Sequence, residues 1–242
     1  MGTEMGRIFD PVFMIRSVPE IISALPVTLA LSLVSVAIGL VIALGVALIR
    51  YFNIRFLSMI CQAYVSFIRG TPALVQLMLV YFGIPIMLRT VNEYLGTDFN
   101  VNGLPRFVFA VIALSFNAGA FMSETIRSAL LAVDIGQLEA AYSVNMSTFQ
   151  ALRRIVIPQA FGIAIPPLAN TIVSVIKETS LVFTISIVDL MAQARIVSSR
   201  SFRFFEIYVV VSVIYWIICT CVSRSLVIVE KRARRHERSL GV

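Results

Sequence analysis

The chain has 242 residues, of which 59% are hydrophobic and 14% are charged, and its formal net charge is +7. Soluble domains carry about 25% charged residues, so the composition excludes an ordinary soluble domain and predicts an all-α integral membrane protein. The positive charges lie between apolar stretches and not on one soluble face. They therefore favour contact with anionic membrane lipid and argue against nucleic acid as a partner.

In chain order, residues 1–25 come first and are too polar to cross a membrane, but they carry apolar residues at helical spacing and predict an interfacial helix. About 20 helical residues cross ~30 Å of hydrocarbon. We therefore predict a polytopic bundle, a single domain 1–242 whose core is 26–229, with about five transmembrane helices at 26–49, 62–88, 107–131, 163–190 and 205–229. Residues 230–242 form a basic tail.

The prolines of the fourth span predict an interruption. Pro158 and the pair Pro166–Pro167 each remove a backbone donor and oppose continuous helix. The sequence thus predicts that the fourth span starts near Pro166, after a short re-entrant or interfacial piece. Broken helices of this kind recur near the binding sites of transporters.

Orientation follows from the Lys and Arg residues near the span ends. With the N-terminus outside and the C-terminus in the cytoplasm, twelve of the twenty basic residues lie on the cytoplasmic side: Arg50, Arg55, Arg69, Arg127, Arg153, Arg154, Arg224, and five from Lys231 to Arg238. Seven lie outside, and Lys177 lies within a span. This orientation places the loop 132–160 in the cytoplasm. An ordinary cytoplasmic loop is the simplest alternative for that segment.

Two predicted spans carry polar residues on one face. Span three holds Asn117, Phe121 and Glu124 on a single helical stripe. Span four holds a similar set, with Asn170, Ser174, Lys177 and Thr184 in one arc and Glu178, Thr179 and Ser180 beside it. Charged side chains at membrane depth face a protein interior or a solute path. Two interpretations remain open here: a path for solute or water, and a structural ion pair such as Lys177 with Glu124.

A catalytic or metal site has no support in the sequence. The three cysteines, Cys61, Cys219 and Cys221, lie in or beside apolar segments and are predicted to be free thiols. His236, the only histidine, lies in the basic tail. Neither polar stripe combines a nucleophile with a base and an orienting group, so no catalytic residue, metal ligand or bound cofactor is assigned.

The loop 132–160 resembles the EAA loop of permease subunits of ATP-binding-cassette (ABC) importers. That pattern is Glu-Ala-Ala, three residues, Gly, and about a dozen residues ending in a hydrophobic residue and Pro. Here Glu139, Ala140, Ala141, Ile157 and Pro158 match, and Asn145 stands at the glycine position. Asn tolerates a left-handed conformation better than other residues with a side chain, so we predict that Asn145 ends a short helix in that conformation.

Further segments resemble the polar amino-acid uptake branch of these importers: FIRGTPALVQLMLVYFGIP (67–85), SFNAGAFMSETIRSAL (115–130), GQLEAA (136–141), RRIVIPQA (153–160), PPLANTIVSVIKETSLV (166–182) and DLMAQA (from 189). Residues 194–216 are most similar to permeases for cystine and related sulfur amino acids. Phe121 and Ser128 stand where Tyr and Gly are more usual in the branch.

The resemblance implies a type I ABC importer permease in a prokaryotic cell membrane. Its partners would be a second permease chain, two ATPase subunits that hold ATP and Mg, and an extracytoplasmic binding protein for an amino acid. Coupling to the ATPase would involve Gly136, Glu139, Ala140, Ala141, Asn145 and Pro158. A glutamine-, histidine- or arginine-type importer is the nearest alternative to cystine, followed by an ion channel, a scaffold or sensor subunit, and last a membrane-embedded enzyme.

Overall fold

The computed structural model describes residues 10–98, 100 and 103–238. Its elements are α1 (Pro11–Ile22), α2 (Leu25–Tyr51), α3 (Arg55–Gly70), α4 (Ala73–Leu95), α5 (Arg106–Leu131), α6 (Ile135–Ser143), α7 (Thr148–Ala151), a π-helical turn η1 (Leu152–Val156), α8 (Ile157–Glu178), a 3-10 helix η2 (Thr179–Ile185), α9 (Leu190–Ser201) and α10 (Phe204–Arg238). The described part of the chain contains no strand, and five of its helical stretches are long and apolar enough to cross a membrane. The all-α, five-span prediction is confirmed.

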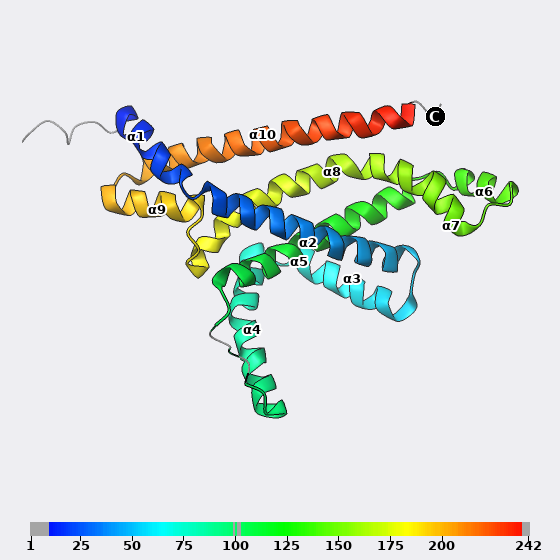
Figure 1. The fold of residues 1–242 in the computed structure, drawn as a ribbon, viewed down its shortest axis with the longest axis horizontal. Helices are drawn as coiled ribbons and strands as arrows, with labels where there is room; N and C mark the ends of the chain where they lie inside the picture. The colour runs from blue at the N-terminus through cyan, green and yellow to red at the C-terminus, as the bar shows by residue number, and fades with distance from the viewer. Residues whose placement is uncertain (1–9, 99, 101–102, 239–242) are drawn as a thin grey trace, which may run out of the picture.

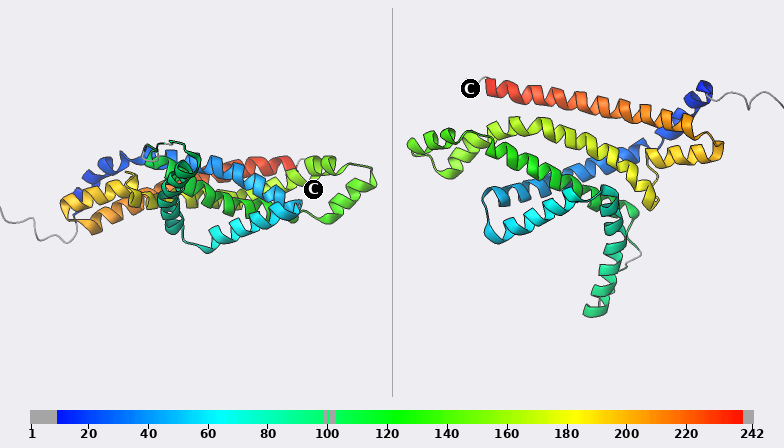
Figure 2. Two further views of the ribbon diagram at one scale, coloured as in Figure 1. Left: turned by 90° about the horizontal axis from the view of Figure 1, so that it is seen from below. Right: turned by 180° about the vertical axis from the view of Figure 1, so that it is seen from behind.

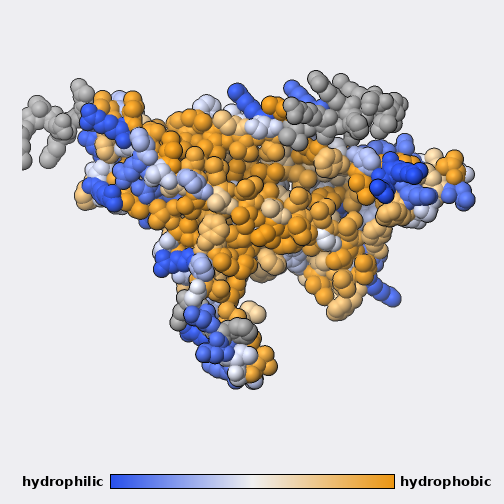
Figure 3. Space-filling model, in the orientation of Figure 1, coloured by the Kyte–Doolittle hydropathy of each residue, from blue (hydrophilic) through white to orange (hydrophobic). Residues whose placement is uncertain are grey.

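The helices α2, α5, α8 and α10 lie along the long axis of the molecule (Figure 1). Among the five candidate spans α5 is the most buried, at 67% of its apolar window, because α2, α3, α4 and α8 all contact it. Figure 2 shows α1 and α9 at one end of this bundle and α6 with α7 at the other. Figure 3 shows a hydrophobic band between these two ends, which are hydrophilic. An apolar belt between polar ends is the surface that a bilayer requires.

The second predicted span, 62–88, is wrong in its bounds. The helix ends at Gly70, Thr71 and Pro72 are extended, and a new helix starts at Ala73. A proline disfavours helical backbone in the residue before it, so Pro72 separates α3 from α4. Only Gln76 and Leu77 of α4 are buried, and α4 points away from the bundle across its long axis (Figure 1). Met78, Val80 and Tyr81 of α4 pack partly against the core. Apolar side chains farther along the helix, Phe82, Ile86 and Met87, are more than half exposed and must face lipid or another chain.

The predicted interruption of span four is also wrong, because helix continues from Thr148 to Ile185. A π-helical turn precedes Pro158, and the N–H of Ile157 donates to the carbonyl of Leu152, five residues back. The wider turn accommodates a proline in the next helical turn. Pro166 and Pro167 lie inside α8, which contacts both α5 and α10. Neighbouring helices allow such prolines in membrane spans, and α8 bows without ending (Figure 1).

The central contact of α2 with α5 depends on small residues. A Cβ atom added to Gly39 of α2 would lie 3.0 Å from the Cβ of Ala118 and 3.1 Å from the carbonyl oxygen of Ser115, both on α5. At Gly119 of α5 an added Cβ would lie 2.9 Å from Ile42. These glycines let two backbones approach closely, as small residues do at membrane helix interfaces.

Gly39→Ala is expected to lower the free energy of unfolding by about 1–2 kcal/mol, because the added methyl group overpacks this contact. Gly45→Ala is the matched control, since a Cβ on Gly45 of the same helix meets nothing within 4 Å. It should be neutral or stabilising through helix propensity. Thermal unfolding of the purified variants distinguishes the two, and equal stability of both variants would contradict the packing argument.

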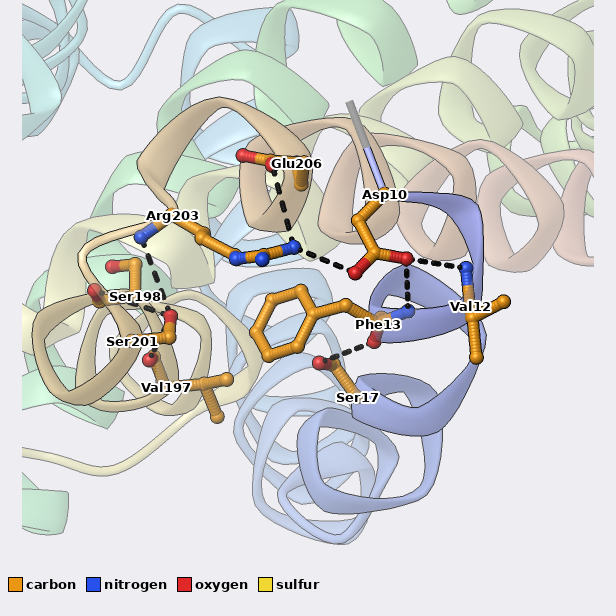
Figure 4. A network of polar contacts seen from close by, with 9 residues as sticks. All are labelled: Asp10, Val12, Phe13, Ser17, Val197, Ser198, Ser201, Arg203 and Glu206. Carbon is orange, nitrogen blue, oxygen red and sulfur yellow. Dashed lines mark hydrogen bonds and ion pairs between the residues drawn. The ribbon is translucent and has the colours of Figure 1, made fainter. Parts of the chain in front are cut away.

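An ionic network holds α1 at the end of the bundle (Figure 4). Asp10 caps α1 by accepting hydrogen bonds from the N–H groups of Val12 and Phe13, both at 3.1 Å, and Arg203 donates to it at 2.9 Å. The hydrogen bond from the Phe13 N–H lowers the pKa of the Asp10 carboxyl most, and the hydrogen bond from Arg203 lowers it further. The guanidinium of Arg203 also lies 4.9 Å from the centre of the Phe13 ring. The predicted helix in residues 1–25 is thus α1, and residues 1–9 lie outside the described part of the chain.

Candidate functional site: a polar groove along α5

Three adjoining pockets form one groove over α5, between α3 and α8. The first, of about 180 Å³, is lined by Asn117, Phe121, Asn170, Thr171, Ser174, Val175 and Glu178. The second, of about 430 Å³, shares Phe121 and Thr171 with the first and adds Arg69, Glu124, Thr125, Ser128, Ala129, Ala132, Ile163 and Pro167. The third, of about 500 Å³, shares Arg69 and Glu124 with the second and adds Arg50, Gln62, Val65, Ser66 and Gly70. We call these the α8 pocket, the middle pocket and the α3 pocket.

The α8 pocket brings together five of the predicted path residues. Asn117 and Phe121 come from α5, and Asn170, Ser174 and Glu178 come from α8. The shared face of each helix follows from the spacing of three and four residues. The prediction that the two polar stripes line one cavity therefore agrees with the geometry for these five side chains.

Asn117 and Glu178 differ in how their polar groups are satisfied. The Asn117 amide is 5% exposed and donates to the Oε1 atom of Gln76 at 2.9 Å. Glu178 has one buried carboxylate oxygen, Oε2, without a hydrogen-bond partner among the described residues. A buried carboxylate oxygen without a donor costs free energy. Glu178 thus brings an unsatisfied buried carboxylate oxygen to the wall of the α8 pocket.

The other predicted residues of span four do not line the α8 pocket. Thr179 is fully buried and its hydroxyl donates to the carbonyl of Ile176, whereas the Thr184 hydroxyl donates to Leu181. Ser180 is half-buried. Lys177 is exposed, and so are Thr184, seven residues after it, and Asn170, seven residues before it at the edge of the α8 pocket. An exposed polar stripe on a span cannot face lipid cheaply, so this face of α8 requires water or another chain.

The suggested pair of Lys177 with Glu124 does not form. The two oxygens of Glu124 are held by different arginines: Arg50 donates to Oε2 at 2.5 Å, and Arg127 donates to Oε1 at 3.2 Å. These side chains are 12% and 29% exposed, and that of Glu124 is 23% exposed. The pairing of Arg50 with Glu124 joins residues 74 positions apart. Helical periodicity relates residues within one helix, so it could not predict this pair.

The helix break after α3 is fixed by one side chain that the sequence prediction did not include. The Nε2 atom of Gln76 donates to the carbonyls of Ile68 and Thr71, at 2.7 and 2.9 Å. Its Oε1 atom accepts from Asn117. Gln76 therefore satisfies carbonyls at the end of α3 and connects them to the α8 pocket. The only sequence signal was an amide in an apolar helix, one turn after Pro72.

At the far end of the bundle, α6 and α7 form a protruding helical pair (Figure 1). Asp134 caps α6 and accepts from the N–H of Gly136 at 2.7 Å. Glu139 and Ala140 are exposed, whereas Ala141 is 2% exposed. Pro158 is exposed in the first turn of α8. The pair also exposes large apolar side chains, Ile135, Val144 and Phe149, each more than 70% exposed, as a docking surface would.

Asn145 adopts the left-handed conformation, with φ of +61°. Its N–H donates to Tyr142 at 2.9 Å, and the N–H of Met146 donates to Ala141 at 3.1 Å. These two bonds form the Schellman motif that ends a helix. The conformation predicted for this position is confirmed.

The chain is similar to known proteins over most of its length. The family model described as "Binding-protein-dependent transport system inner membrane component" matches residues 35–235. The chain is 38% identical to the probable amino-acid ABC transporter permease protein PatM of Vibrio harveyi, over 89% of this chain and 92% of that protein. It is 40% identical to the L-cystine transport system permease protein TcyB of Bacillus subtilis, over 86% and 84% of the two chains.

A solved structure, described as the crystal structure of an amino acid ABC transporter with histidines, superposes with a TM-score of 0.79. It is 35% identical in sequence, and the match covers 93% of this chain and all of that one. The chain therefore belongs to the family of inner membrane components of binding-protein-dependent transport systems, among the amino-acid ABC importer permeases.

Proposed function

We propose that this chain moves a polar amino acid across the membrane along the groove over α5, between two permease chains. The groove carries the proposal because it places the charged side chains of Glu178, Arg69 and Glu124 where lipid would otherwise lie. The amino acid arrives from an extracytoplasmic binding protein. The two ATPase subunits, which hold ATP and Mg, dock on α6 and α7, and this chain catalyses no bond change.

The proposed orientation has α6 and α7 in the cytoplasm, the C-terminus inside and the N-terminus outside. Closure of the ATPase dimer moves α6, and the motion reaches α8 because helix is continuous from Thr148 through η1 into the groove. Two states of the groove, open to one side or the other, give alternating access. The apolar face of α4 supports a second permease chain as a neighbour of this one.

Cystine is the proposed substrate. The resemblance in residues 194–216 and the 40% identity to an L-cystine permease support it. The test is reconstitution with the ATPase and the binding protein in proteoliposomes. Cystine should stimulate ATP hydrolysis and enter the vesicles. Stimulation by glutamine or arginine instead would contradict the choice of cystine, and ATP-independent flux through the chain alone would favour a channel.

Lys177→Ala is expected to reduce uptake at least tenfold while the assembled complex stays intact, because the exposed stripe of α8 loses its charge. Lys231→Ala, an exposed lysine of α10 beyond the fifth apolar stretch, is the matched control. Uptake by proteoliposomes and gel filtration of the complex are the measurements. Normal uptake by Lys177→Ala would remove Lys177 from the solute path.

A further inference from the structure

The groove holds more cationic groups than its carboxylates can pair. Arg69 lines the middle and α3 pockets, and Arg50 lines the α3 pocket. Glu124 borders both pockets and pairs with Arg50 and with a third arginine, Arg127. Each oxygen of Glu124 is already held by one arginine, Oε2 by Arg50 and Oε1 by Arg127. Arg69 is left without a carboxylate within ion-pair distance among the residues that the structure describes.

Arg69 has no ionic partner among the described residues, and its side chain makes one weak aromatic contact. Its guanidinium carbon lies 5.8 Å from the centre of the Phe121 ring, at the limit of a cation–π contact. It belongs to the last turn of α3, whose end is fixed by the hydrogen bonds from Gln76. About 14 residues of helix separate it from Arg55, or about 21 Å of rise. An arginine without a carboxylate partner, exposed on a groove between apolar helices, favours an anionic ligand.

Phe121 separates this cation from the unpartnered carboxylate. The ring borders both the middle pocket, which contains Arg69, and the α8 pocket, which contains Glu178. Glu178 carries a buried oxygen without a hydrogen-bond partner. An anion in the middle pocket would satisfy Arg69, and the α-carboxylate of an amino acid is such an anion.

We propose that Arg69 binds the α-carboxylate of the transported amino acid. Arg69 lines the middle and α3 pockets, whereas Lys177 lines none of the three. The planar guanidinium also matches a carboxylate better than an ammonium does. The inference rests on the proposed function, since it concerns the same groove.

The test compares two ligands on the assembled permease–ATPase complex in lipid nanodiscs, without the binding protein. The ligands are the amino acid that stimulates ATP hydrolysis in the reconstitution, whether cystine, glutamine or arginine, and its α-amide, which lacks the carboxylate charge. The wild-type complex should bind the acid about 10- to 100-fold more tightly than the amide, as a charge-assisted contact predicts. Arg69→Gln should bring this ratio close to one, and Arg69→Lys should retain part of it.

Arg55→Gln, an exposed arginine at the start of the same helix, should keep the wild-type ratio. The ratio is insensitive to a general loss of fold, because both ligands report on the same protein. An Arg69→Gln complex that keeps the wild-type ratio would overturn the assignment, as would a wild-type complex that shows no preference for the acid. Failure of every amino acid to enter proteoliposomes would instead reject the proposed function.

Discussion

Glu124→Gln lowers the free energy of unfolding by about 2–3 kcal/mol, the largest loss that we expect from a single change in the groove. The substitution removes one negative charge and leaves Arg50 and Arg127 facing each other across a neutral amide. Both arginines are mostly removed from water, since their side chains are 12% and 29% exposed. The Nε atoms of both are already buried without a partner among the described residues.

Thermal unfolding of the purified complex measures this loss. Glu20→Gln is the matched control, because Glu20 pairs with Arg200 at 3.1 Å on the surface, where their side chains are 45% and 72% exposed. Exposed pairs contribute about 0–1 kcal/mol, so this control should change little. Adding Arg50→Gln to Glu124→Gln should cost less than the two single changes together. Equal stability of the Glu124 and Glu20 variants would contradict a stabilising role for the cluster.

Asn145→Val is expected to impair transport, whereas Asn145→Gly preserves it. The left-handed conformation at φ of +61° costs a side chain with a Cβ about 1–2 kcal/mol, with the β-branched residues most affected. Glycine adopts it readily. Loss of the Schellman bonds would fray α6, which has nine residues and carries the Glu139–Ala140–Ala141 segment.

The measurement is the ATP hydrolysis that the loaded binding protein stimulates, with retention of the ATPase on the permease as a second readout. Thr148→Val is the control, since Thr148 is exposed at the start of α7, within the same protrusion. It should transport normally. Equal transport by Asn145→Val and Asn145→Gly would remove the conformational explanation for this residue.

The features that the sequence predicts correctly depend on local chemistry. The left-handed turn at Asn145 follows from the tolerance of Asn for that conformation, and the pocket-facing set Asn117, Asn170 and Ser174 follows from helical periodicity. Length and hydropathy are sufficient for five spans.

The features that the sequence could not predict depend on tertiary contacts. The helix break at Thr71–Pro72 falls inside an apolar run, and it moves Arg69 from a span end to the middle of the groove. The pairing of Arg50 with Glu124 joins distant helices. Continuous helix through Pro166 and Pro167 depends on the neighbours of α8, which oppose the local preference of proline.

The most direct test of the groove as the solute path is labelling of Ser174→Cys in the assembled transporter, with Cys61, Cys219 and Cys221 replaced by serine. Ser174 lines the α8 pocket, and Val213→Cys, on the exposed apolar face of α10, is the control. A membrane-impermeant thiol reagent should label Ser174→Cys in one state of the ATPase cycle and not in the other, and should leave Val213→Cys unlabelled. Labelling of Ser174→Cys in neither state would contradict a path along α5.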